Sequence, residues 1–221
     1  SYINEQRVYT LAYLNYWHPS TNIFFVHSNT STPRIAINNS GNAISTFSSQ
    51  YAASELIYRS HYDSTSWESI LFSDYLFIYT FDQKYPYTGL DDSNNAHYVW
   101  VSDSSNVEWC KALYYDKTCT PETLNTDGYL NVPVAKIAIT QNDNAYVIWQ
   151  QQSNYLHESI YLASYNGSSW NKPSDISEHI NPFGSNAINP HIDASSNGSY
   201  AAAVWVQHNY SGKNQVFLYR F

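Results

Sequence analysis

Apolar and polar residues alternate along two well-separated stretches of this chain, in a pattern typical of paired β-strands. Residues 33–47 contain a strand with isoleucine at alternate positions, then a polar turn, then a second strand that ends on Phe47. Residues 135–149 repeat this arrangement and end on Trp149. Alternation with a period of two indicates strands that bury one face. The pattern therefore predicts two copies of one strand–turn–strand unit.

The match between these two units continues beyond the aromatic residue. Trp67 follows Ile57 by ten positions in one unit, and Trp170 follows Ile160 by ten positions in the other. The turn in the second of these segments contains Asn166-Gly167, which is a strong signal for a tight hairpin. We therefore expect third and fourth strands in each unit.

Further copies of the unit precede, separate and follow these two. Five aromatic residues mark the ends of the second strands, and they stand 30, 53, 49 and 56 residues apart: Trp17, Phe47, Trp100, Trp149 and Trp205. Three of these intervals are close to the roughly 40–50 residues of a propeller blade. Because recurring aromatic residues most simply fill the core between sheets, we expect buried packing roles for six of them. The six are Phe47, Trp67, Trp100, Trp149, Trp170 and Trp205.

The repeat predicts an all-β, β-propeller-like fold with about four to five blades of antiparallel strands, including an incomplete blade at a chain end. A length of 221 residues suits a single domain over residues 1–221. We expect its repeat units at about 1–32, 33–80, 81–132, 133–188 and 189–221. The last unit stops after its third strand, which exposes a strand edge. This edge is expected to pair with the N-terminal segment, or alternatively with a neighbouring subunit in self-assembly.

The tyrosine–turn–tryptophan segments resemble the repeats of sialidase-like bacterial β-propellers, whose Asp-box reads Ser-x-Asp-x-Gly-x-Thr-Trp. Residues 163–170 keep the glycine, the hydroxyl residue before the tryptophan and the tryptophan itself. Residues 60–67 keep both hydroxyl residues and the tryptophan. A tyrosine, Tyr62 or Tyr165, stands where the motif has its aspartate. The resemblance implies a propeller built from a degenerate, non-catalytic form of this repeat.

A second resemblance is to propeller lectins of the fucose-binding type. These lectins share the hydrophobic-Tyr strand followed by Gly-x-x-Trp, and they place Arg, Glu and Trp in pockets between blades. Only the first of the two matched units offers a comparable set, which consists of Glu55, Arg59 and Trp67. The resemblance implies a candidate ligand pocket at these three residues.

Charge and composition exclude several classes of partner. The net charge is −8, and no run of Lys or Arg occurs. Nucleic acids and anionic membrane surfaces are therefore poor candidates. Apolar runs fall short of the roughly 18 residues that span a bilayer, so no membrane span is expected. The 22 tyrosines and many asparagines suit polar recognition, so we expect a glycan or an extracellular protein as partner.

The two cysteines, Cys110 and Cys119, are nine positions apart. This spacing suits a disulfide that closes a hairpin-sized loop, although two unrelated buried thiols are the alternative. A disulfide indicates an oxidising compartment, and hence a secreted, extracellular or cell-surface protein. Four sequons, at Asn29, Asn166, Asn197 and Asn209, are compatible with N-glycosylation, but about four are expected by chance in so Asn-rich a sequence.

Candidate catalytic chemistry is sparse. Recognition of a carboxylate in the manner of a sialidase needs three converging arginines, and the chain has only Arg7, Arg34, Arg59 and Arg220, of which Arg34 is in a sialidase-like Pro-Arg-Ile context. That position is expected to be an exposed strand residue, because the matching positions are Lys136 and His191. The acids Asp91, Asp92 and Asp193 are more simply turn formers. No residue spacing typical of a zinc or calcium site occurs, so we expect no metal. Because the arginines and acids form no catalytic set either, we expect no catalytic residues and no cofactor.

These observations favour a secreted or cell-surface, non-catalytic β-propeller that acts in adhesion, glycan binding or extracellular assembly. The alternative is a glycoside hydrolase or lyase of a five-bladed propeller family, whose chemistry needs paired carboxylates.

Overall fold

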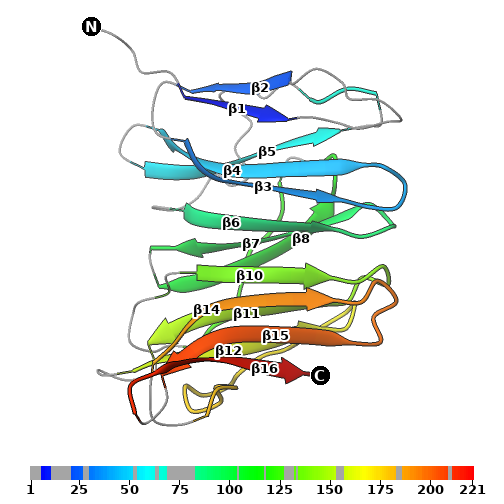
Figure 1. Cartoon of the computed structure of the whole chain (residues 1–221). Helices are drawn as coiled ribbons and strands as arrows, with labels where there is room; N and C mark the ends of the chain where they lie inside the picture. The colour runs from blue at the N-terminus through cyan, green and yellow to red at the C-terminus, as the bar shows by residue number, and fades with distance from the viewer. Residues whose placement is uncertain are drawn as a thin grey trace, which may run out of the picture.

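The computed structural model of the chain is built from antiparallel β-strands (Figure 1). The structure describes residues 6–10, 21–26, 30–51, 54–62, 65–68, 83–103, 105–116, 118–126, 132, 134–152, 157–182, 186–208 and 211–221. Within these residues no helix is found, and hence none with the length and hydropathy needed to cross a membrane. One two-stranded sheet is followed by four larger sheets.

Each sheet is formed by strands that are consecutive in the chain. The first sheet consists of β1 (Gln6–Thr10) and β2 (Thr21–Val26). The second has β3 (Thr30–Ile37), β4 (Ala43–Tyr51) and β5 (Ser54–Tyr62). The third has β6 (Gln83–Leu90), β7 (Asn95–Ser102), β8 (Asn106–Leu113) and β9 (Glu122–Thr123). The fourth has β10 (Val134–Ile139), β11 (Ala145–Gln152), β12 (Glu158–Tyr165) and β13 (Trp170–Asn171), and the fifth has β14 (Ala187–Ala194), β15 (Ala201–His208) and β16 (Asn214–Arg220).

The sheets stack face to face in chain order, from β1–β2 at one end to β14–β16 at the other (Figure 1). The first strands of successive large sheets, β3, β6, β10 and β14, contact one another. Sheets that are each wound in chain order and packed through successive faces are the arrangement of propeller blades. The predicted all-β, propeller-like fold is therefore confirmed.

The interfaces between the large sheets share one packing pattern. Aliphatic residues on one face of a sheet pack in a common cluster with the recurring aromatic residue of the next sheet. The three clusters combine Ile44 and Ile57 with Trp100, Val99 and Val101 with Trp149, and Ile148 and Ile160 with Trp205. Period-two alternation produces this result, because it gives every middle strand one aliphatic and one aromatic face.

Trp17 lies outside the described residues, and the other recurring aromatic residues lie where the repeat predicted them, with two exceptions. The side chains of Phe47, Trp100, Trp149 and Trp205 are buried. Trp67 and Trp170 are only half-buried, because each lies at the outer end of its sheet, where it pairs with the tyrosine that ends the third strand. Core packing therefore accounts for the inner aromatic residues fully and for the outer two in part.

Cys110 and Cys119 form the expected disulfide, which joins β8 to the loop that leads into β9. Cys110 is fully buried, and the half-buried Cys119 packs against the same cluster as Trp100. The bond therefore closes a short loop against the interface between the second and third sheets.

Replacing both cysteines by serine should lower the free energy of unfolding by about 2.5–3 kcal/mol, because a bond that closes so short a loop restricts the unfolded chain by about that amount. Urea denaturation followed by tryptophan fluorescence measures this change. Because the sequence contains no other cysteine, reduction of the wild-type protein is the matched control and should give the same loss. A change below about 0.5 kcal/mol would contradict a stabilising role for the bond.

Candidate functional site

Four residues occupy the same position on the first strands of the four large sheets. Each pairs with the residue directly before the recurring aromatic residue of the second strand: Arg34 with Thr46, Tyr87 with Val99, Lys136 with Ile148, and His191 with Val204. Since the first strands contact one another, this position recurs as a row along the stack. We refer to these four residues as the inner row.

Three of the four inner-row residues stand directly after a bulge in their strand. Arg34, Tyr87 and His191 each directly follow a proline, at a shift in the strand register. Proline has no N–H to give to the ladder, so it is tolerated in a strand chiefly at such a bulge. Tyr85 and Asn189, which lie inside two of these bulges, have positive φ angles of 55° and 56°. Bulges turn side chains away from the regular alternation, and they are over-represented beside functional sites.

The inner-row side chains converge on Tyr87 and on one another. The guanidinium carbon of Arg34 lies 4.2 Å from the ring centre of Tyr87, and Nζ of Lys136 lies 5.7 Å from the same centre. Lys136 also donates a hydrogen bond of 2.7 Å to Nε2 of His191. An ammonium group has no lone pair to accept with, so this contact makes His191 a neutral imidazole with its proton on Nδ1.

The environment lowers the pKa of two of these basic groups, so they lose their protons more readily. Burial lowers the pKa of Lys136 to about 8, and the nearby Arg34 guanidinium acts in the same direction. Burial lowers the pKa of His191 as well, and the charges of Lys136 and Arg34 lower it further. Burial is thus the larger cause of both pKa shifts, and the neighbouring cations are the smaller one.

No carboxylate neutralises the inner row within the described part of the chain. None of the ion pairs found there includes Arg34, Lys136 or His191. Nε of Arg34 is also buried without a hydrogen-bond partner among these residues. Clustered cations that lack an internal counter-charge attract an anionic group, since such a group would relieve their mutual repulsion.

The sequence carries a signal for the inner row, namely the residue that precedes each recurring aromatic residue by thirteen or fourteen positions. The expectation that Arg34 is an exposed strand residue is wrong, because its side chain is half-buried and stacks on Tyr87. The variation from Arg34 to Lys136 to His191 at matching positions argues against a strictly repeated site, but it preserves basic character. Tyr87 was missed, yet it precedes Trp100 by thirteen residues, as Arg34 precedes Phe47.

Glu55 and Arg59 of the predicted lectin-like pocket form hydrogen bonds with different partners. Glu55 accepts a 2.6 Å hydrogen bond from Ser48. Arg59 is buried, and its guanidinium donates to the carbonyl groups of Tyr114 and Tyr115 at 2.9 and 3.0 Å. Arg59 therefore anchors the loop after β8 to β5, and a pocket formed with Trp67 stays a prediction.

Two of the four sequons lie in described turns. The side chains of Asn166 and Asn197 are exposed, and each Oδ1 accepts hydrogen bonds from nearby serine residues. Asn29 and Asn209 lie outside the described residues. Glycosylation at any of the four stays a prediction.

The three acidic residues near the first strands all accept hydrogen bonds, and Asp91 and Asp92 belong to the turn after β6. The two oxygens of Asp91 accept hydrogen bonds of 2.7 Å from the backbone and side chain of Asn95. Asp92 accepts two hydrogen bonds of 3.0 Å from Asn39 in the preceding sheet's turn. Asp193 caps the backbone N–H of Ala194 at 2.9 Å.

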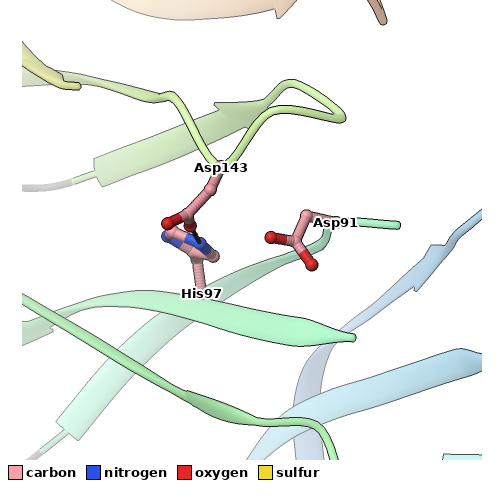
Figure 2. Close-up of side chains that lie close together, drawn as sticks. All are labelled: Asp91, His97 and Asp143. Atoms are coloured by element: carbon pink, nitrogen blue, oxygen red, sulfur yellow. Dashed lines mark hydrogen bonds and ion pairs between the residues drawn. The ribbon is translucent and has the colours of Figure 1, made fainter. Parts of the chain in front are cut away.

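A second polar cluster links the third and fourth sheets. Figure 2 shows His97 of β7 beside Asp143, which belongs to the turn between β10 and β11. Nε2 of the fully buried His97 lies 2.9 Å from Oδ1 of Asp143, whose Oδ2 binds Nζ of Lys111. The two sheets are therefore tied together by a histidine–carboxylate–lysine contact whose histidine and aspartate are 46 residues apart in the sequence.

The cluster in Figure 2 also has donor atoms of the kind that bind metals. One ligand atom each from Asp91, His97 and Asp143 lie within 4.8 Å of one another. However, the Lys111 ammonium already supplies a positive charge at Asp143, and both oxygens of Asp91 bind Asn95. Both carboxylates are therefore engaged by protein groups, and the arrangement serves as an inter-sheet link, in which Nδ1 of His97 is buried without a hydrogen-bond partner among the described residues.

Solved structures with similar folds are sialidases and lectins. A Trypanosoma rangeli sialidase in complex with the inhibitor DANA matches with a TM-score of 0.60 and 10% identity over 98% of this chain and 38% of its own. The Hadza microbial sialidase Hz136 matches with a TM-score of 0.55 and 12% identity over 87% of this chain and 44% of its own. A mutant Aleuria aurantia lectin in complex with alpha-methyl-L-fucoside matches with a TM-score of 0.51 and 12% identity over 84% of this chain and 56% of its own.

These similarities define the class of fold. The chain has a sialidase-like, β-propeller-like fold, and it spans between 38% and 56% of the length of the three proteins above. At identities of 10–12% the likeness concerns the fold and not the activity. No family model matches the sequence, and a search of curated proteins finds no match.

The buried His97 predicts a loss of stability on mild acidification. Burial, the largest influence, lowers the pKa of His97, so the unfolded chain takes up this proton first as the pH falls below about 6.5. Burial opposes ionisation of Asp143, but hydrogen bonds from His97 and Lys111 hold its pKa below the usual value, so its contribution is lost only at lower pH. The free energy of unfolding should therefore decline between about pH 7 and 5.5 in the wild type, and decline less in His97→Gln.

Urea denaturation at several pH values measures this difference. His208→Gln is the matched control, because His208 is exposed on β15. If both variants decline as steeply as the wild type, His97 does not carry the pH dependence.

Proposed function

We propose that this chain is a non-catalytic, extracellular glycan-binding module, and that the inner row receives an acidic group of the glycan. Such a module would act in adhesion or in assembly at a cell surface. The observation that supports this most directly is the convergence of Arg34, Lys136 and His191 around Tyr87 without a carboxylate partner in the described residues.

The chemistry of the inner row fits an acidic sugar. A guanidinium and an ammonium group donate strong, charge-assisted hydrogen bonds to a carboxylate or sulfate. The tyrosine and histidine supply further polar atoms for sugar hydroxyl groups, in a site that also contains an aromatic ring. The lectin and sialidases with similar folds raise the expectation of carbohydrate binding, although by analogy of fold alone.

An extracellular location is supported by the Cys110–Cys119 disulfide, since such bonds persist in oxidising compartments. A glycoside hydrolase or lyase is the alternative. A binding role is favoured because the oxygens of Asp91 are engaged by Asn95, which leaves this carboxylate poorly placed as a general acid. A panel of glycoside substrates, assayed beside the binding experiments, separates the two functions.

Lys136→Met should weaken binding of an acidic oligosaccharide about tenfold to a hundredfold, since one charge-assisted hydrogen bond contributes roughly 1.5–3 kcal/mol. Calorimetry with one carboxylated and one matched neutral oligosaccharide measures the effect. Lys172→Met is the control, because it removes the same charge from an exposed ion pair with Glu122 on the outer strands. Equal binding of acidic and neutral sugars by the wild type would contradict the proposal.

Binding of the acidic oligosaccharide should weaken as the pH rises from about 7 to 9. The pKa of Lys136 is lowered to about 8, so its ammonium loses its proton in this range, whereas an ordinary lysine keeps it. As the pH falls below about 6.5, His191 gains its charge and binding should strengthen. In Lys136→Met the decline between pH 7 and 9 should disappear. A wild-type affinity that is constant over that range would show that Lys136 does not contact the anion.

A further inference from the structure

The outer face of the last sheet, directed away from the fourth sheet, is apolar and uncovered. Val216 and Leu218 of β16 are 76% and 71% exposed, and Val204 of β15, which pairs with Leu218, is 36% exposed. All three project from the face opposite to the buried Trp205 and Phe217, because neighbouring residues on a strand alternate between faces. Exposed aliphatic residues that are contiguous on one sheet mark an interaction surface.

The corresponding residues of the fourth sheet show how this face is normally used. Ile148 precedes Trp149 as Val204 precedes Trp205, and Ile160 precedes Tyr161 as Val216 precedes Phe217. Ile148 and Ile160 are both 0% exposed, because the last sheet packs on them. The outer face of the last sheet therefore has the residue pattern of a face that is covered by another sheet.

The charges on this face have a regular arrangement. Asp193 of β14 and Arg220 of β16 both pair with Ala202 of β15, so they lie at opposite sides of one row across the sheet. They line a hollow of about 310 Å³, and the Arg220 guanidinium lies 4.1 Å from the ring centre of Tyr200. Within the described residues neither charge forms an ion pair.

We propose that this face packs against the same face of a second copy of the chain, about a two-fold axis parallel to β15. This axis places β14 of one copy opposite β16 of the other. Each row of residues that are paired across the three strands then faces the same row of the second copy. Asp193 of one copy then faces the partner's Arg220, and the reverse contact forms as well. The same axis places Val204, on the middle strand, opposite its own counterpart. The face is thus self-complementary in charge at Asp193 and Arg220 and in apolar surface at Val204, as a two-fold interface requires, whereas Leu218, in the same row as Val204 and His191, faces the partner's His191.

The area of the face indicates a weak dimer. Three strands about 4.8 Å apart and about seven residues long, with a rise of about 3.3 Å per residue, give roughly 400–500 Å² on each copy. The total is below the roughly 1,200 Å² of standard stable interfaces. The association is therefore expected to be weak and to depend on protein concentration.

Sedimentation equilibrium between about 5 and 300 μM measures this association. The wild type should dimerise, and Val216→Lys combined with Leu218→Lys should abolish dimerisation. Ile35→Lys combined with Ile37→Lys is the matched control and should leave it intact, because these isoleucines are equally exposed but belong to β3 at the other end of the large sheets. A wild-type monomer at all concentrations overturns the proposal.

Cross-linking and charge reversal identify the geometry. Val204→Cys should form an intermolecular disulfide on mild oxidation, against a background without free cysteine, whereas Ile35→Cys should not. Arg220→Asp should weaken the dimer at least tenfold, and adding Asp193→Arg should restore it. A dimer that forms through the unpaired edge of β16 instead would leave Val204→Cys uncross-linked, which overturns the face-to-face arrangement. These measurements need no glycan, so their outcome is independent of the proposed binding function.

Discussion

The packing of an aromatic side chain from one sheet onto the aliphatic face of the preceding sheet is the contact on which the rest of this structure depends. It recurs at the three interfaces between the large sheets, where Trp100, Trp149 and Trp205 are the aromatic partners. Facing sheets pack about 10 Å apart, and a buried indole fills much of that separation. Because the aromatic residue is the fifth or sixth residue of every second strand, the interfaces share a similar register, and the first strands are brought side by side.

The inner row is a consequence of that register. In each large sheet, the residue thirteen or fourteen positions before the aromatic residue occupies the same place on the first strand. The first strands lie side by side, and this brings together four residues that are distant in sequence: Arg34, Tyr87, Lys136 and His191. Keeping three basic groups close together is unfavourable in itself, and it requires sheets that cannot move apart. The His97–Asp143–Lys111 contact supplies a polar tie at the middle interface. Stability of the stack and binding by the row are therefore parts of one arrangement.

The sequence predicted the strands and their stacking well, because period-two alternation and the spacing of Phe47 and Trp149 are local signals. It also predicted the disulfide from a spacing of nine residues. The candidate site was predicted poorly, since it depends on how the first strands of different repeats lie beside one another, and three of these strands carry bulges at Pro33, Pro86 and Pro190 that interrupt the alternation. The contact between His97 and Asp143 joins two different repeats, and no pattern within a single repeat could predict it.

The stacked sheets hold Lys136 in a partly desolvated group of cations. The most direct test is the pKa of the Lys136 ammonium, measured by NMR titration of selectively labelled lysine, with Lys136→Met to assign the signal. The expected pKa of the Lys136 ammonium is about 8, because the group is buried and lies near the Arg34 charge. A pKa near the ordinary lysine value of about 10.4 would place the side chain in solvent and would contradict the inner row as a site.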